Sequence, residues 1–287
     1  MQILLQSLLI GLNIVVSISI IGIVVAATFT KASIFDSEFY RRLLAMIQPE
    51  SALVGVGLGM LLALTVNGGF AISKKLGPGV LWNWITGKYY SPREEELVVM
   101  FLDMKDSTTI AESLGTLRFS ALIRDFFSDL TGPLKSTGAR VSHYIGDEAV
   151  IYWHPQTAFK KCACLRLVSA FNKVLEAKGA EYVQKYGFVP EFKAGAHIGM
   201  VVATEVGDVK SEVVFHGDTL NTAARIQGLC GDEDRQFLIS GELVERIDAT
   251  AGGIELESLG ERVVKGRAQQ IELYAVVSRS VLVAERP

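Results

Sequence analysis

Cysteine, histidine and net charge are all scarce in this 287-residue chain. Its three cysteines have no CxxC spacing, which argues against a disulfide framework or a zinc ribbon, and its four histidines show no zinc-ligand spacing. A formal net charge of −3 provides no overall field that would attract nucleic acid, so no nucleic-acid partner is expected. Any phosphate chemistry must therefore come from a local arrangement of side chains.

Charge is absent from two long apolar stretches near the N-terminus. Residues 1–30 carry no charged side chain, and a second such stretch runs from Ser51 to Ser73. Each has the roughly 20 residues that a helix needs to cross a hydrocarbon core. A cleaved signal peptide is disfavoured, because a charged n-region and a small-x-small cleavage site are missing. The pattern predicts a transmembrane helical hairpin over residues 1–75, with spans at about 8–29 and 51–73.

Two spans would place both ends of the chain on the same side of the membrane. Slightly more lysine and arginine residues follow the second span than occupy the connecting loop, which favours a cytoplasmic C-terminal part. Residues 76–96 combine Gly-Pro-Gly with several aromatic residues, as expected of a juxtamembrane linker. The prediction is a multi-pass protein of the inner (plasma) membrane.

After the linker, strand and helix patterns alternate. Leu97–Leu102 is a short apolar run typical of a buried strand. The remaining expected elements, in chain order, are a helix from the Asp106 region to about Leu130, a hairpin of strands 140–144 and 149–153, a helix over about 158–186, a second hairpin about Gly199, a helix over 220–229, and strands after Phe237. This order predicts an α+β fold of the ferredoxin-like, split βαβ type.

Two aspartates are placed where a carboxylate is costly unless it is paired or binds a metal. Asp103 ends the first apolar strand, and Asp147 lies in the Gly-Asp turn of the first hairpin. A split βαβ sheet can bring both to the same end of adjacent strands, where they would repel unless a cation lay between them. Either aspartate alone is more often a turn or capping residue. Together they predict an oxygen-ligated divalent metal site.

Two further segments carry polar side chains suited to phosphate. Asn221 and Arg225 are four residues apart on a predicted helix and therefore share a face. An amide beside a guanidinium suits a sugar edge and a developing phosphate charge. The alternative is a helix capped by Asp218 with a surface arginine. Lys265-Gly266-Arg267 forms a basic turn between strands, which by itself is typical of a solvated surface.

Four segments together resemble the class III adenylate/guanylate cyclases in order and spacing. They are Phe101 to Thr108, Tyr144 to Glu148, Gly217 to Arg225, and Lys265 to Arg267. The resemblance runs from about Leu97 to Val277 and implies a membrane-anchored, bacterial-type cyclase with its catalytic domain at residues 97–278 and a tail at 279–287. The implied reaction converts a nucleoside triphosphate to the 3′,5′-cyclic nucleotide and pyrophosphate, for signalling, with two divalent ions, Mg²⁺ or Mn²⁺.

The resemblance assigns metal and phosphate roles to the first two segments. Asp103 and Asp147 match the two metal-binding aspartates. Met104 matches a position that binds metal through its backbone carbonyl. Ser107 and Thr108 match the turn whose backbone N–H groups bind phosphate at a helix N-terminus.

The other two segments match residues that act on the sugar and the phosphates. Asn221 matches the residue that orients the ribose, and Arg225 matches the arginine that stabilises the transition state. Arg267, or else Lys265, matches the lysine that holds the terminal phosphates. In this family each site lies between two chains, so the resemblance implies a homodimer with two equivalent active sites at its interface.

The positions that read the base depart from the family pattern. Adenylate cyclases usually carry a lysine and an aspartate there, and guanylate cyclases a glutamate and a cysteine, whereas this chain has His143 and Val214. ATP is the expected substrate because adenylate cyclases are the commonest members. GTP, a pyrimidine nucleotide, or a catalytically degenerate signalling scaffold are the alternatives. The Gly-Gly-Asp/Glu-Glu-Phe hairpin of diguanylate cyclases is absent.

Overall fold

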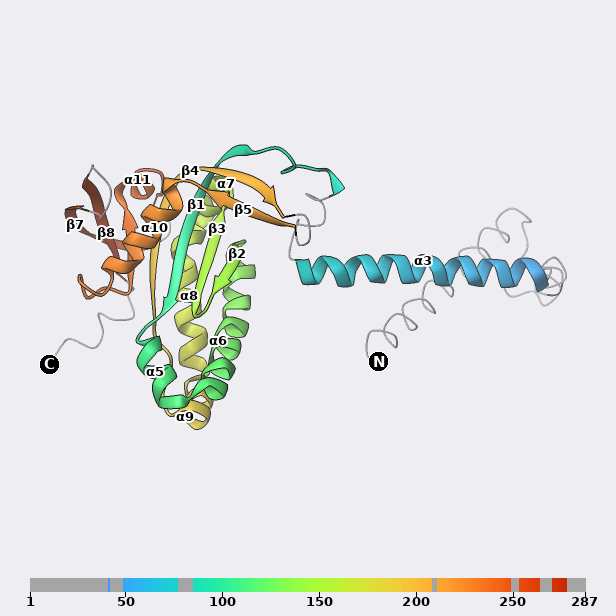
Figure 1. Cartoon of the computed structure of the whole chain (residues 1–287), viewed down its shortest axis with the longest axis horizontal. Coiled ribbons are helices and arrows are strands. Elements are labelled where there is room, and N and C mark those ends of the chain that lie inside the picture. The colour runs from blue at the N-terminus through green and yellow to red at the C-terminus, as the bar shows by residue number, and fades with distance from the viewer. Residues whose placement is uncertain are drawn as a thin grey trace. The chain divides into compact units, whose positions relative to one another are not determined.

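The chain divides into two compact units, Met1–Gly87 and Lys88–Pro287. The computed structural model describes residue 41 and residues 49–76, 85–207, 211–248, 253–263 and 270–277 (Figure 1).

Unit one contains the helix α3, Pro49–Leu76. Its side chains are described over residues 57–73, a length of about 26 Å at 1.5 Å per residue. That stretch includes Thr65 and Asn67, whose side chains donate to carbonyls of the preceding turn. Among the described residues, no helix is both long enough and apolar enough to cross a membrane.

This finding contradicts the predicted hairpin, its span at 51–73 and the multi-pass location in the inner (plasma) membrane. Within the described part of α3, the apolar residues are interrupted by Thr65, Asn67 and several glycines, which lower its hydropathy. The other predicted span, residues 8–29, lies outside the described residues.

Unit two is built on a mixed sheet. Its first four strands lie in the order β2-β3-β1-β4, and each neighbouring pair is antiparallel, which is the split βαβ arrangement. Beyond β4 the sheet continues through β6, β8 and β7, and β5 pairs with β4. The strands are β1 (Arg93–Met104), β2 (Arg140–Ile145), β3 (Glu148–Trp153), β4 (Phe192–Val206), β5 (Glu212–His216), β6 (Phe237–Ser240), β7 (Glu255–Val263) and β8 (Gln270–Val277).

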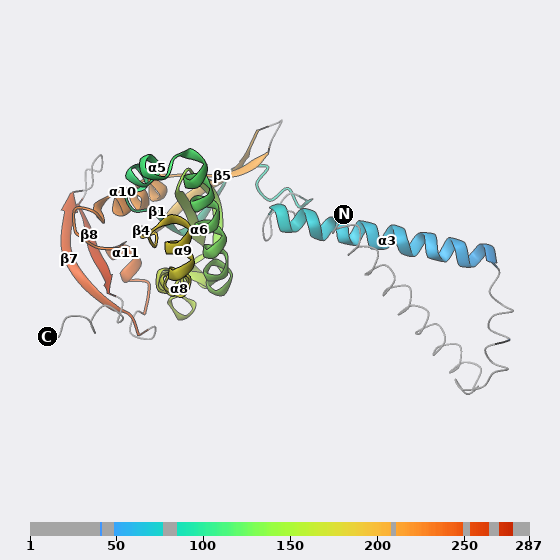
Figure 2. The same cartoon turned by 90° about the horizontal axis from the view of Figure 1, so that it is seen from below.

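Helices cover both faces of this sheet (Figures 1 and 2). On one face, α6 and α8 pack over β1 and β3, while α10 lies on the other face against β4, β1 and β6. The helical segments are α5 (Ser107–Leu114), α6 (Thr116–Thr137), α7 (Pro155–Phe159), η1 (Lys160–Cys162), α8 (Ala163–Ala177), α9 (Gly179–Tyr186), α10 (Asp218–Leu229) and α11 (Gly241–Val244).

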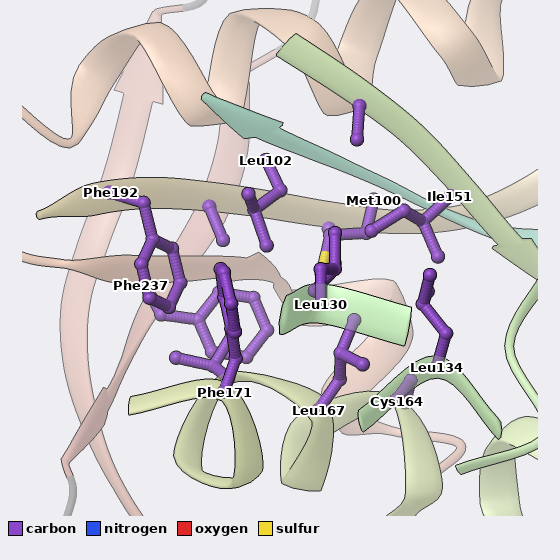
Figure 3. Close-up of a cluster of buried hydrophobic side chains, with 14 of the residues drawn as sticks. Met100, Leu102, Leu130, Leu134, Ile151, Cys164, Leu167, Phe171, Phe192 and Phe237 are labelled. Carbon is purple, nitrogen blue, oxygen red and sulfur yellow. The ribbon is translucent and has the colours of Figure 1, made fainter. Parts of the chain in front are cut away.

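The main core lies between the sheet and helices α6 and α8 (Figure 3). Phe171 on α8 is at its centre, with ring centroids 4.9 Å from those of both Phe126 and Phe192. From β1, Met100 and Leu102 point into this core, whereas Val99 lies in a second cluster on the opposite face. Burial on both faces makes β1 a central strand, as its unbroken apolar run predicts.

The second predicted hairpin, about Gly199, is wrong. Instead, β4 is one continuous strand of 15 residues. Gly199 serves packing and not a turn, because a Cβ at this position would lie 2.5 Å from Oγ1 of Thr219 on α10. Glycine in a strand indicates either a bend or a close approach of another element, and the sequence does not distinguish them.

Both long predicted helices are interrupted. Gly115, with φ 73°, separates α5 from α6. Lys161 and Cys162 adopt φ values of 54° and 52°, which separate α7 and η1 from α8. Apolar spacing continues across these breaks, so periodicity alone predicts one helix where the backbone changes direction.

Candidate active site

Strand register brings the two predicted metal-binding aspartates to one end of the sheet. Asp103, near the end of β1, lies opposite Glu148 of β3 on one side and Lys193 of β4 on the other. Asp147 immediately precedes β3 in the turn after Gly146, whose φ of 62° favours glycine. The predicted juxtaposition of the two carboxylates is present.

The carboxylate pair is partly buried and crowded by like charge. Burial and the neighbouring charges of Asp147 and Glu148 raise the pKa of Asp103 to about 7, while the facing Lys193 lowers it. The Oδ2 atom of Asp147 is buried and accepts no hydrogen bond. An unpaired carboxylate oxygen beside a second carboxylate is the arrangement that a divalent cation would relieve.

The donor set fits a magnesium-type ion shared with a substrate. Within the described ranges, no three His, Cys, Asp or Glu side chains converge on one metal position. Mg²⁺ is commonly held by one or two carboxylates plus substrate phosphates, which two aspartates satisfy. The Met104 side chain is buried in the main core and is therefore not available as a metal ligand.

The first residues of α5 follow directly after β1. Ser107 and Thr108 begin this helix, and Asp106 at its N-cap adopts a left-handed conformation with φ 57° and makes no side-chain cap. The first N–H groups of a helix have no intrahelical acceptor. This helix end therefore offers uncapped N–H groups a few residues from Asp103, as the resemblance implies for a phosphate site.

Helix α10 lies unusually close to β4. A Cβ on Gly195 would lie 2.5 Å from the Cα of Gln227, so the helix backbone rests on the strand at that point. At the other end of the contact, Thr219 fills the space beside Gly199 and donates from Oγ1 to the carbonyl of Met200 at 2.6 Å. These two contacts fix where the side chains of α10 lie.

The buried residues of α10 form one stripe along the helix, and polar side chains lie on either side of it. Successive helix residues are rotated by about 100°, so Asn221 and Arg225 lie on one side of buried Ile226 and Gln227 lies on the other. Arg225 has a buried Nη1 atom without a hydrogen-bond acceptor. Gln227 donates from Nε2 to Oδ2 of Asp103 at 3.4 Å. Within one chain, therefore, Gln227 is the α10 residue that donates a hydrogen bond to the carboxylate pair.

The remaining predicted site residues are separated from this cluster or lie outside the described residues. His143 is exposed on β2, with its Nδ1 2.9 Å from the hydroxyl of Ser142. Val214 is half-buried on β5, which is not a neighbour of β2 in the sheet. Lys265 and Arg267 lie outside the described residues, between β7 and β8.

Sequence reasoning missed Gln227 and Lys193. The Lys193 position follows from the β4 register, which the predicted hairpin about Gly199 obscured. Gln227 is two residues beyond Arg225, so the signal was present as a polar residue on the predicted helix. Its proximity to Asp103 depends on the close approach at Gly195, which no local pattern reveals.

The fold is that of the class III cyclases. It is similar to a solved bacterial light-regulated adenylyl cyclase, with a TM-score of 0.63 and 19% identity over 81% of this chain and 66% of that one. The guanylate cyclase domain of RhGC from Catenaria anguillulae, solved with GTP, aligns with a TM-score of 0.52 and 22% identity over 65% of this chain and 99% of that one.

Sequence comparison shows the family directly. The family described as adenylate and guanylate cyclase catalytic domain matches residues 89–278, and the chain belongs to it. Domains of this family generally use divalent metal ions. Adenylate cyclase 2 of Rhizobium meliloti (strain 1021) is 36% identical over 210 residues, which cover 73% of this chain and 58% of that protein. The alignment thus spans little more than half of that relative's length.

The packing at Gly195 makes a stability prediction. We expect Gly195→Ala to lower the free energy of unfolding by about 1–3 kcal/mol, because the added methyl would overlap the backbone of α10, which cannot rotate away. Chemical denaturation of the full chain measures this change.

A matched control lies on α10 itself. Gly228 is exposed, and an added Cβ there would meet no atom within 4 Å. Gly228→Ala should therefore leave stability unchanged or raise it by up to about 1 kcal/mol. Equal stability of Gly195→Ala and the natural protein would contradict the described contact between α10 and β4.

Proposed function

We propose that this protein is an active nucleotidyl cyclase that converts ATP to 3′,5′-cyclic AMP and pyrophosphate with two divalent ions, Mg²⁺ or Mn²⁺. The observation that carries the proposal is the crowded pair Asp103 and Asp147, with its unpaired buried oxygen, in a chain of the cyclase family. When bound there, divalent ions would lower the pKa of the ribose 3′-hydroxyl and neutralise charge on the triphosphate.

In this proposal the chain's own groups bind and orient the nucleotide. Oxygens of Asp103 and Asp147 hold the ions, and the uncapped N–H groups of Ser107 and Thr108 bind phosphate oxygens. Asn221 orients the ribose so that O3′ faces the α-phosphorus. The bond from O3′ to the α-phosphorus forms as the bond from that phosphorus to the α–β bridging oxygen breaks; the 3′-hydroxyl proton passes to solvent water, and pyrophosphate leaves.

The charge that develops at the α-phosphorus needs a cationic partner. Arg225 supplies it in this proposal, and its buried Nη1 without an acceptor supports that role. Arg267 and Lys265 are proposed to hold the terminal phosphates, as the family resemblance implies.

We infer a homodimer from the geometry of α10 and the family resemblance. Gln227 faces Asp103 of its own chain, whereas Asn221 and Arg225 lie on the other side of the same helix. They are therefore unsuited to act beside their own chain's carboxylates. We propose that they complete the partner's site, so that two chains form two equivalent active sites.

ATP is proposed as the substrate because two relatives from Rhizobium meliloti (strain 1021) are named adenylate cyclases. His143 offers an imidazole N–H to a base, while Val214 offers no hydrogen bond. Receptor-type guanylate cyclases of Caenorhabditis elegans also match, at 22–24% identity, so GTP is the second candidate.

Removing either aspartate tests the metal site. Asp103→Asn and Asp147→Asn should each lower turnover by at least about a hundredfold, because stabilisation worth several kcal/mol is lost. Formation of cyclic nucleotide by the purified full chain with Mn²⁺ measures this. Asp232→Asn, at an exposed aspartate, should retain full activity. An active Asp103→Asn protein would overturn the metal-site assignment.

Mixing two inactive variants tests the shared sites. Arg225→Ala alone should lower kcat by about 10²–10³-fold. Co-refolding it with Asp103→Asn should restore about a quarter of natural activity, since half the dimers are mixed and each then has one intact site of two. Mixing Asp103→Asn with Asp147→Asn should restore none. No recovery in the first mixture would show that sites are not shared.

A competition among ATP, GTP, CTP and UTP tests the base. With all four at equal concentration and Mn²⁺ present, cyclic AMP should be the main product. If another cyclic nucleotide predominates, its parent triphosphate and not ATP is the preferred substrate. No product from any of the four would instead favour a catalytically degenerate scaffold.

A further inference from the structure

We infer that Gln227 is a positioning residue for Asp103, and that it ties each chain's metal carboxylates to the helix that serves the other active site. This inference rests on the proposed function. The contact that carries it is the hydrogen bond from Nε2 of Gln227 to Oδ2 of Asp103, 3.4 Å long and partly buried.

The backbone of Gln227 is held in place before its side chain makes this bond. Gly195 lets the Cα of Gln227 approach β4 directly, and Gly195 lies on the strand two residues from Lys193, which faces Asp103. On the helix, buried Ile226 and Cys230 anchor the turns on either side of Gln227. The amide therefore reaches Asp103 from a fixed point of the fold.

A neutral amide suits this position. It donates to one carboxylate oxygen without adding a charge, so the carboxylate can still bind a cation through its remaining lone pairs. Charges of both signs already face Asp103, from Glu148 on β3 and Lys193 on β4. Groups that hydrogen-bond a metal ligand orient it, and their removal typically weakens metal binding by about 10–100-fold.

The same helix connects the two proposed sites. Asn221 and Arg225 would contact the nucleotide bound at the partner's carboxylates, whereas Gln227 holds Asp103 of its own chain. Because α10 is a single helix of 12 residues, one rigid element carries both the groups proposed for one site and the donor to Asp103 at the other. Gln227 thus has a role distinct from that of Asn221, although both residues lie on α10.

The first test measures Mn²⁺ binding to the nucleotide-free full chain by electron paramagnetic resonance. Gln227→Met has a similar length and no donor, and it should weaken Mn²⁺ binding by about tenfold. Gln227→Asn has a side chain one methylene shorter and should also weaken Mn²⁺ binding by about tenfold. It replaces Gln227→Met in this test if that variant does not fold. Asp103→Asn should bind no measurable Mn²⁺, and Gly228→Ala should bind normally.

Turnover provides a second readout that a purely structural role would not move. In Gln227→Met the Mn²⁺ concentration for half-maximal activity should rise about tenfold, while the KM for ATP at saturating Mn²⁺ stays unchanged. Excess Mn²⁺ should restore kcat in this variant but not in Arg225→Ala. If the variant is active and its Mn²⁺ affinity and Mn²⁺ requirement are unchanged, the inference about Gln227 is overturned and the proposed function is not. A natural protein that binds no Mn²⁺ and forms no cyclic nucleotide would overturn the proposed function.

The mixed dimer identifies the site at which Gln227 acts. When one chain carries Arg225→Ala and the other Asp103→Asn, the intact site uses Asp103 of the first chain and Arg225 of the second. Gln227→Met added to the first chain should raise the Mn²⁺ requirement about tenfold, and added to the second it should not. The opposite result would show that Gln227 acts on the partner's site and would overturn the inference.

Discussion

The repulsion between two partly buried carboxylates is the constraint on which the site depends. Asp103 and Asp147 are brought together by the antiparallel register of β1 and β3, and their crowding, not a preformed ligand cage, is what fits a divalent cation. Strand pairing elsewhere in the sheet keeps them there, although burial leaves Oδ2 of Asp147 without a hydrogen bond. A cation and a triphosphate would supply the charge and the ligands that the protein leaves out.

The orientation of the α10 side chains depends on how closely this helix can approach β4. Gly195 and Gly199 remove the side chains that would otherwise separate β4 from α10. The helix consequently presents Gln227 to its own Asp103 and turns Asn221 and Arg225 to the other side. The division of one active site between two chains, which we propose, follows from that orientation and not from any property of the residues themselves.

Local pattern was a good guide where one element determined its own structure. The apolar run of β1, the Gly-Asp turn at Gly146 and the helix that carries Asn221 all follow from residue spacing. Predictions from the sequence were wrong where the same residues are compatible with two different structures. Gly199 suits a turn or a close contact, and the apolar stretch within α3 suits a membrane span or another helix. Only the three-dimensional structure distinguishes such alternatives, because both produce the same local pattern.

The sequence by itself determined the family and the α+β class of the domain, and it predicted that Asp103 lies near Asp147, because four motifs kept their order and spacing across the domain. Tertiary structure decided that β4 is continuous, that no described helix is suited to cross a membrane, and that Gln227 reaches Asp103. The continuity of β4 and the reach of Gln227 depend on contacts between residues far apart in the chain. Asp103 and Gln227 are separated by 124 positions, and only strand register and helix packing bring the two crowded carboxylates and their donor together.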